Sequence, residues 1–382
     1  MPGPHYLDHS YDARLTRKVK QLRLSTLHID PLLFLGLLIL CTIGIFNLYS
    51  ASNQYGHLVK SQLLHYLVAF ILMLCVAQIP PRYLRVVSPW LYGIALFSLF
   101  LVFFFGHVSQ GARRWLGVGS FLVQPSELMK IAMPMMLSWL WQQSRQYNPQ
   151  YIVSLSLALL LIPVLLIAKQ PDLGTAILIG LSGMYVLLLA GLDRKIIISG
   201  VVLVAAMIPF GWHMMHDYQK MRVITFLYPE KDPLGSGYNI IQSKIAVGSG
   251  GFAGKGYLHG TQSHLSFLPA HTTDFIFSVG AEEWGFIGCC LLIACYCFIF
   301  VRSSILSLQA QDVFSRLLTG SLSLIFITCA LINMGMVVGL LPVVGVPLPF
   351  MSYGGSSMMS MMVSFGMIMS VQTHKKLWAS SN

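Results

Sequence analysis

The stretch TQSHLSFLPAHTTDFIFSVGAEE, residues 261–283, passes from a polar loop into a long apolar run. Asp274 lies at the junction, directly before Phe275. A carboxylate at the edge of a hydrophobic helix is costly to desolvate, and charges so close to hydrocarbon tend to be functional. The alternative is a helix N-cap, in which the carboxylate accepts hydrogen bonds from the first turn. The stretch predicts a membrane helix with a functional acid, Asp274, at its mouth.

The composition of the whole chain is that of an integral membrane protein. Its 382 residues are 55% hydrophobic and 10% charged, whereas soluble domains carry about 25% charged residues. The net charge of +11 would suggest nucleic acid in a soluble protein, but in a membrane protein Lys and Arg first report orientation. We therefore expect membrane lipids and no nucleic acid as partners. The seven cysteines lie in apolar runs without metal-ligand spacing and are interpreted as packing residues.

About ten apolar segments approach the roughly 20 residues that span a bilayer. They cover residues 31–50, 62–79, 87–106, 125–142, 151–168, 173–191, 195–213, 275–301, 314–341 and 350–372. The distribution of Lys and Arg in the flanks places both termini in the cytoplasm. The pattern predicts an all-α polytopic membrane protein. Its expected parts are a cytoplasmic tail (1–30), one membrane domain (31–373) with an extracytoplasmic loop (214–274) between the seventh and eighth helices, and a second cytoplasmic tail (374–382).

Cations gather in an outward segment that precedes the fourth apolar run. Arg113, Arg114 and Trp115 stand close together there. Basic residues on the outer face run against the positive-inside rule, and an anionic ligand such as a phosphate or pyrophosphate would explain them. The alternative is that the arginines reach lipid headgroups and that the tryptophan belongs to an interfacial belt.

The same segment predicts the start of the fourth helix. Gln124-Pro125 has the form of a helix start with proline at the first position. Glu127 and Lys130 are three residues apart, so they can pair on one face of this helix. They would then lie close to the outward arginines.

Several other outward residues are candidates for the site. Lys169 and Asp172 flank the turn between the fifth and sixth segments and can pair, in a functional or a purely structural turn. Glu282 lies eight residues after Asp274, on roughly the same side of the helix. It is either a second functional acid or one member of a structural ion pair.

Two Gly-rich stretches lie on the same face. The stretch 248–256, GSGGFAGKG, departs from the P-loop pattern, but it can still form an anion-binding nest or let a lipid pass close to the backbone. Lys244 and Lys255 supply further cations near it. The stretch 342–357, PVVGVPLPFMSYGGSS, is irregular backbone at membrane depth, which is tolerated where it lines a cavity or is buried in protein. Ser352 and Tyr353 are therefore candidates to face the site, with a compact helix connection as the alternative.

These motifs resemble the SEDS family (shape, elongation, division and sporulation), over residues 30–375. The resemblance rests on long and specific stretches: GARRWLGVGSFLVQPSELMK (111–130), KQPDLGTA (169–176), DPLGSGYNIIQSKIAVGSGGFAGKG (232–256), TDFIFSVGAEEWGFIG (273–288) and PLPFMSYGGSS (347–357). The spelling DPLGSGYNIIQSKIA is similar to the branch that acts in cell elongation rather than to the division branch.

The resemblance implies a ten-helix SEDS fold and a peptidoglycan glycosyltransferase in cell wall synthesis. Such an enzyme polymerises lipid II at the outer face of the bacterial inner membrane, together with a class B penicillin-binding protein, a transpeptidase. The family's essential aspartate falls on Asp274, and its functional Trp, Glu and Lys fall on Trp115, Glu127 and Lys130. The chain departs from the family spelling just before Asp274, with Thr272 and Ala270 where His and Glu are common.

The implied reaction is an inverting glycosyl transfer with undecaprenyl pyrophosphate as leaving group. Asp274 would be the general base, and outward cations would hold the leaving group. The candidates are Arg113, Arg114, Lys130, Lys244 and Lys255. No cofactor is certain, and a divalent cation could share this task. Two other functions stay open: a lipid II flippase and a non-enzymatic scaffold for the transpeptidase. The outward clustering of charge favours the enzyme.

Overall fold

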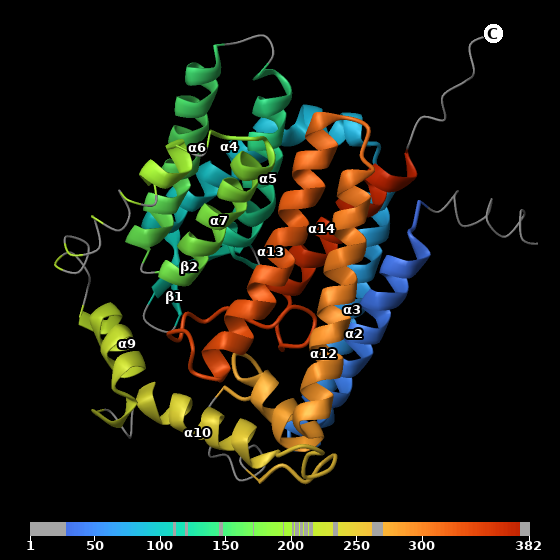
Figure 1. The fold of residues 1–382 in the computed structure, drawn as a ribbon, viewed down its shortest axis with the longest axis vertical. Helices are drawn as coiled ribbons and strands as arrows, with labels where there is room; N and C mark the ends of the chain where they lie inside the picture. Colours follow the sequence, from blue (N-terminus) through green and yellow to red (C-terminus); the bar gives the residue numbers. More distant parts are fainter. Residues whose placement is uncertain are drawn as a thin grey trace, which may run out of the picture.

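The computed structural model is a bundle of long helices, several of which run its full height (Figure 1). It describes residues 28–109, 112–118, 121–144, 148–170, 172–193, 195–200, 217–231, 236–261 and 270–374, with single positions between 202 and 213. Six described helices are long and apolar enough to cross a membrane. The chain is a membrane protein, as the composition predicts.

Nine described helices match predicted apolar segments. They are α2 (Pro31–Ala51), α3 (Gly56–Ala77), α4 (Pro81–Phe105), α5 (Pro125–Gln142), α6 (Pro149–Lys169), α7 (Leu173–Leu189), α12 (Ile276–Leu308), α13 (Val313–Val337) and α14 (Ser356–Thr373). The predicted span 195–213 lies largely outside the described residues. The last helix begins later than predicted, because prolines and the Gly354-Gly355 pair keep the preceding residues irregular, with Phe350 at φ 61°.

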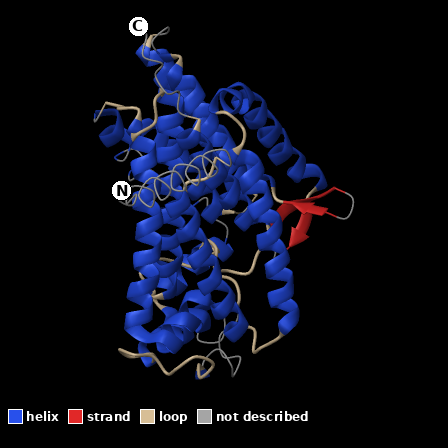
Figure 2. Ribbon diagram, turned by 90° about the vertical axis from the view of Figure 1, so that its right-hand side faces the viewer, coloured by secondary structure: helices blue, strands red, loops and turns tan. Residues whose placement is uncertain are grey.

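The predicted outward segment before the fourth apolar run contains three short strands. They are β1 (His107–Ser109), β2 (Ala112–Val118) and β3 (Phe121–Val123), and they form an antiparallel sheet in the order β1-β2-β3. The strands project from one side of the otherwise helical bundle (Figure 2). Pairing on both sides gives the central strand β2 partners for its backbone N–H and C=O groups. The all-α architecture holds for the membrane helices, and the sheet is an addition to it.

The long loop before α12 contains α9 (Asp217–Leu227), a 3-10 helix (Pro229–Lys231) and α10 (Ser236–Ser249). The last of these, α10, lies within the loop 214–274 that the sequence predicts. At its middle, the Ser243 hydroxyl donates to the carbonyl of Val337, at 2.9 Å. This bond ties α10 to the end of α13, so the loop is packed against the bundle.

Helix α12 is broken at Gly285, whose φ of 64° and ψ of −161° are not helical. The Gly-rich stretch 250–256 packs at this break. The backbone N–H groups of Lys255 and Gly256 donate to the carbonyls of Glu282 and Glu283, at 3.0 and 3.1 Å. Because these N–H groups already donate to carbonyls of α12, they do not point at an anion, and the prediction of an anion-binding nest is wrong.

We expect Gly285→Ala to destabilise the protein by about 1–3 kcal/mol, since this backbone conformation is almost confined to glycine. An added Cβ would also lie 2.2 Å from the backbone nitrogen of Gly254. The matched control is Gly248→Ala in α10, where nothing lies within 4 Å of an added Cβ. It should stabilise slightly, by about 0.5–1 kcal/mol. Thermal unfolding of the purified proteins measures both, and equal melting temperatures would contradict the prediction.

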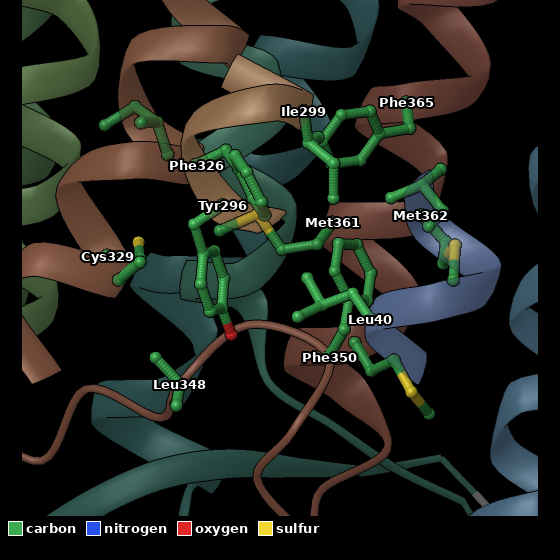
Figure 3. Close-up of a cluster of buried hydrophobic side chains, with 14 of the residues drawn as sticks. Leu40, Tyr296, Ile299, Phe326, Cys329, Leu348, Phe350, Met361, Met362 and Phe365 are labelled. Atoms are coloured by element: carbon green, nitrogen blue, oxygen red, sulfur yellow. The ribbon is translucent and has the colours of Figure 1, made fainter. Parts of the chain in front are cut away.

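An aromatic cluster holds the loop before α14. Phe326 contacts Phe365 edge to face, with ring centroids 5.1 Å apart, and also contacts Phe350. The Tyr296 hydroxyl donates to the carbonyl of Pro349, at 2.6 Å. Figure 3 shows Phe350 from this loop among side chains of the helices. The loop is thus buried in protein and held by the core of the bundle.

Both described ends of the chain lie at one end of the bundle. The rings of His28 and His374 stack at 3.8 Å. At the same end, Arg302 near the end of α12 pairs with Asp30, at 2.5 Å. The two ends therefore lie on one side, as an even number of spans predicts. The first turn of α12, which follows Asp274, lies at the opposite end of that helix.

Candidate active site

A pocket of about 460 Å³ lies where α5, α7, α12 and α14 begin. Its charged and aromatic lining comprises Arg114, Trp115, Glu127, Lys130, Asp172, Asp274 and Tyr353. Every residue of this set was predicted from the sequence to belong to the site. The remaining wall is largely the loop 345–347 and the residues 354–357 at the start of α14.

Asp274 is half-buried at the mouth of α12. The N-cap position of α12 is Phe275, and no side chain caps the helix there. The N-cap alternative for Asp274 is therefore wrong. The carboxylate lies next to Gly345, another residue of the lining, where an added Cβ would be 3.9 Å from its Oδ2 atom. The acid therefore lines the pocket and does not cap the helix.

The predicted pair of Glu127 and Lys130 is confirmed. The two charged groups lie 2.6 Å apart, and the residues are only 8% and 6% exposed. The hydroxyl of Ser360 in α14 also donates to Glu127, at 2.6 Å. Sequence reasoning missed Ser360, which stands among methionines and has no charged neighbour. A charge pair buried this deeply has to be held by such hydrogen bonds.

Arg114 forms an ion pair with Asp172, at 3.4 Å. The Asp172 carboxylate also accepts from the backbone N–H of Thr175 and so caps α7. The prediction that Lys169 pairs with Asp172 is wrong. Lys169 is the exposed last residue of α6, whereas Asp172 turns inward to the pocket. Arg113 lies beside Arg114 in β2, where its backbone is paired with Val108.

Glu282 does not line the pocket, so its predicted grouping with Asp274 is wrong. Its fully buried carboxylate accepts from Lys255 Nζ at 2.6 Å, and from the backbone N–H and hydroxyl of Thr261 at 2.8 and 3.0 Å. A buried carboxylate needs such donors. Glu282 therefore anchors the 250–261 loop, which matches the structural alternative, and this pairing holds Lys255 away from the pocket.

Two further candidates also lie off the pocket lining. Lys244 is exposed in α10, against Gly339. Ser352 is buried, and its hydroxyl donates to the carbonyl of Thr273 at 2.7 Å and accepts from the N–H of Leu348 at 2.8 Å. Ser352 thus holds two walls of the pocket together, while its neighbour Tyr353 lines it. Within the described ranges, no three His, Cys, Asp or Glu side chains are grouped to hold a metal ion.

Helix N-termini add positive potential to the pocket. Helices α5 and α14 both begin at its wall, and neither has a side-chain cap. The first N–H groups of a helix and its dipole favour an anion. Together with Arg114 and Lys130, these termini make the pocket suited to a phosphate-bearing ligand. The Asp274 carboxylate belongs to the same lining.

The chain is similar to known proteins over most of its length. The profile of the FtsW/RodA/SpoVE family, described as cell cycle protein, matches residues 23–377. The peptidoglycan glycosyltransferase MrdB of Escherichia coli K12 is 47% identical over 357 residues, which cover 93% of this chain and 96% of the relative. The peptidoglycan glycosyltransferase RodA of Treponema pallidum is 31% identical, over 91% of this chain and 98% of the relative.

Two solved structures share the fold. One belongs to a peptidoglycan synthase complex and is described as showing the structural coordination of polymerization and crosslinking by that complex. It has a TM-score of 0.78 and 30% identity, and the match covers 90% of this chain and 97% of that one. The other is the rod shape determining protein RodA of Thermus thermophilus, with a TM-score of 0.70, 26% identity, and 91% and 98% coverage. The resemblance to the SEDS family is confirmed: the chain belongs to the FtsW/RodA/SpoVE family of cell cycle proteins.

Proposed function

We propose that this peptidoglycan glycosyltransferase polymerises lipid II in the pocket, with Asp274 as general base. The observation that carries the proposal is that Asp274, Arg114 and the Glu127–Lys130 pair line one cavity. A carboxylate is needed for proton transfer and cations are needed for a phosphate-bearing leaving group, and both line this pocket. The names of the relatives supply the reaction class.

The reaction joins two lipid-linked sugars. Asp274 takes the proton from the 4-hydroxyl of the acceptor's GlcNAc. The oxygen attacks the anomeric carbon of the donor's MurNAc from the face opposite the pyrophosphate. The new glycosidic bond forms as the bond to the pyrophosphate oxygen breaks, so the anomeric configuration inverts. Undecaprenyl pyrophosphate leaves with the electron pair of the broken bond.

The leaving group needs charge stabilisation more than protonation. Arg114, Lys130 and the N-termini of α5 and α14 are placed to provide it. Lys244 and Lys255, which lie off the pocket, are not part of this proposal. A divalent cation could share the charge of the pyrophosphate, and a metal titration of the purified enzyme would decide that.

The proposed setting is the bacterial inner membrane, with the pocket on the periplasmic side. The described chain ends lie together, and Asp274 lies at the far end of α12 from Arg302. Cytoplasmic termini would therefore place the pocket outside. A class B penicillin-binding protein is the proposed partner, since a structural relative is a synthase complex that coordinates polymerization and crosslinking.

Polymerisation of lipid II by the purified chain, with and without its transpeptidase partner, tests the function. We expect glycan strands that a muramidase digests. A flippase would instead translocate lipid II across reconstituted vesicles without making strands. A scaffold would leave lipid II unchanged in both arms. Either result would overturn the proposal.

Arg114→Gln should weaken binding of undecaprenyl pyrophosphate by roughly tenfold or more, because it removes a charged donor from the pocket. The control is Arg82→Gln, at the exposed start of α4, where the guanidinium stacks on Tyr83 at 4.9 Å. This control should bind like the parent protein. Titration of the purified proteins with undecaprenyl pyrophosphate measures the dissociation constants. Equal affinities for the two variants would remove Arg114 from the pyrophosphate site.

A further inference from the structure

We infer that Asn333, a fully buried residue of α13, is a positioning residue for the acid of the site. Its side chain holds the backbone of Asp274 and that of Val346, a residue of the pocket lining, in one fixed arrangement. The inference rests on the proposed role of Asp274 as general base. It adds a residue from a helix that supplies none of the charged groups of the pocket.

The geometry of the Asn333 amide is specific. Its Nδ2 atom donates to the carbonyl of Asp274 at 2.8 Å and to the carbonyl of Val346 at 2.8 Å. An amide nitrogen has two hydrogens, so both are used. Both acceptors are carbonyl oxygens, which fixes the orientation of the amide. One side chain therefore joins the residue that carries the acid to a residue that lines the pocket.

The Asn333 bond completes a set of three consecutive carbonyl contacts. The carbonyl of Thr272 accepts from the N–H of Tyr353 at 2.9 Å, and that of Thr273 accepts from the Ser352 hydroxyl at 2.7 Å. The carbonyl of Asp274 accepts from Asn333. The backbone that leads to the acid is thus held by a hydrogen bond at each of residues 272, 273 and 274.

Fixed placement matters for this reaction because a general base has to lie within about 2.6–3.2 Å of the proton it takes. A shift of about 1 Å can lower a rate on the order of a hundredfold. Asn333 sets the separation between Asp274 and Val346, and hence the width of the pocket at the acid. A purely structural role would be to satisfy two buried carbonyls and no more.

Asn47 in α2 offers a matched control for that structural role. It is also fully buried, and its Nδ2 atom donates to the carbonyl of Ile276 at 3.0 Å, in the first turn of α12. It does not line the pocket. Asn47→Leu and Asn333→Leu remove the same chemical group from the same part of the fold. Only Asn333→Leu releases the residue that carries the acid.

The experiment compares the two variants in purified full-length protein with lipid II as substrate. Both should lower the melting temperature, Asn333→Leu by more, because it leaves two carbonyls without their donor and Asn47→Leu leaves one. Asn333→Leu should lower kcat on the order of tenfold to a hundredfold, with lipid II affinity changed less than about twofold. Asn47→Leu should keep kcat within about threefold of the parent. Equal losses of kcat in both variants, or an unchanged kcat in Asn333→Leu, would overturn the inference.

Two further variants complete the test. If Asn333→Leu does not fold, Ser352→Ala removes the neighbouring tie to Thr273, and kcat should fall by about threefold or more; an unchanged kcat then overturns the inference. Asp274→Asn is measured in parallel. If Asp274→Asn stays active, the proposed function fails and the inference with it. If it is inactive while Asn333→Leu retains its kcat, only the inference fails.

Discussion

Asp274→Asn is expected to lower the rate of lipid II polymerisation by about 10²–10⁴-fold, the usual contribution of a general base. The amide has the shape of the carboxylate but cannot take the proton of the acceptor hydroxyl. The protein should remain folded, because the ties to residues 272–274 use backbone carbonyls, which the substitution leaves in place. Glycan formation by the purified variant measures the rate, and its melting temperature reports folding.

The control for this variant is Asp193→Asn, which changes an exposed carboxylate just after α7. It removes the same charge without touching the pocket, so its rate should equal that of the parent. Lipid II binding provides a second readout. Asp274→Asn should still bind lipid II, because the proposed pyrophosphate contacts remain. A folded Asp274→Asn protein that polymerises at the parental rate would exclude Asp274 as the base.

Sequence reasoning predicted the parts of this protein that follow from local pattern. Long apolar runs predicted the helices, and Pro125 marked the start of α5. The pair of Glu127 and Lys130 followed from helix geometry, since residues three apart share a face. Motif resemblance identified the family. These inferences depend on neighbours along the chain or on long motifs, and the structure and the comparisons bear them out.

Sequence reasoning failed where partners come from distant segments. Asp172 pairs with Arg114 and not with Lys169, because β2 lies close to the start of α7 in the folded protein. Glu282 is held by Lys255 because α12 breaks at Gly285 and the Gly-rich stretch packs there. Such pairings depend on the tertiary fold, and no spacing along the chain indicates them.

Uncharged polar residues in apolar helices were the other omission. Asn333 and Ser360 both stand in runs that predict membrane spans, and both contact residues of the site. A general signal was present, since a polar side chain in a membrane helix is costly unless it has a partner. Screening each span for such residues would have found them, although not the partners they serve.

Lys130→Met is expected to destabilise the protein by about 3–5 kcal/mol, the usual effect of removing one member of a buried ion pair. Glu127 would keep the hydrogen bond from the Ser360 hydroxyl but lose the positive charge of Lys130. The same substitution removes a cation from the proposed pyrophosphate site, so activity should fall as well. Thermal unfolding measures the first effect, and lipid II polymerisation by the folded fraction measures the second.

The double variant Glu127→Gln/Lys130→Met separates these two effects. With both charges gone, no unpaired carboxylate remains at position 127, and most of the lost stability should return. Activity should not return, because the pocket still lacks the cation. If the double variant polymerises lipid II at the parental rate, the pair serves only the fold, and Lys130 has no part in holding the leaving group.

Lys255→Met is the control that tests whether the loss of activity depends on where the broken ion pair lies. Lys255 also pairs with a buried glutamate, Glu282, at 2.6 Å, but off the pocket lining. Its loss should cost less stability than that of Lys130, because Thr261 still donates two hydrogen bonds to Glu282. The polymerisation rate of the folded Lys255→Met protein should stay within a few-fold of the parental rate, because a cation outside the site does not stabilise the leaving group. Equal losses of activity in Lys130→Met and Lys255→Met would mean that breaking either buried pair disturbs the enzyme alike. Loss in Lys130→Met alone would assign the pyrophosphate contact to the pocket that Asp274 lines.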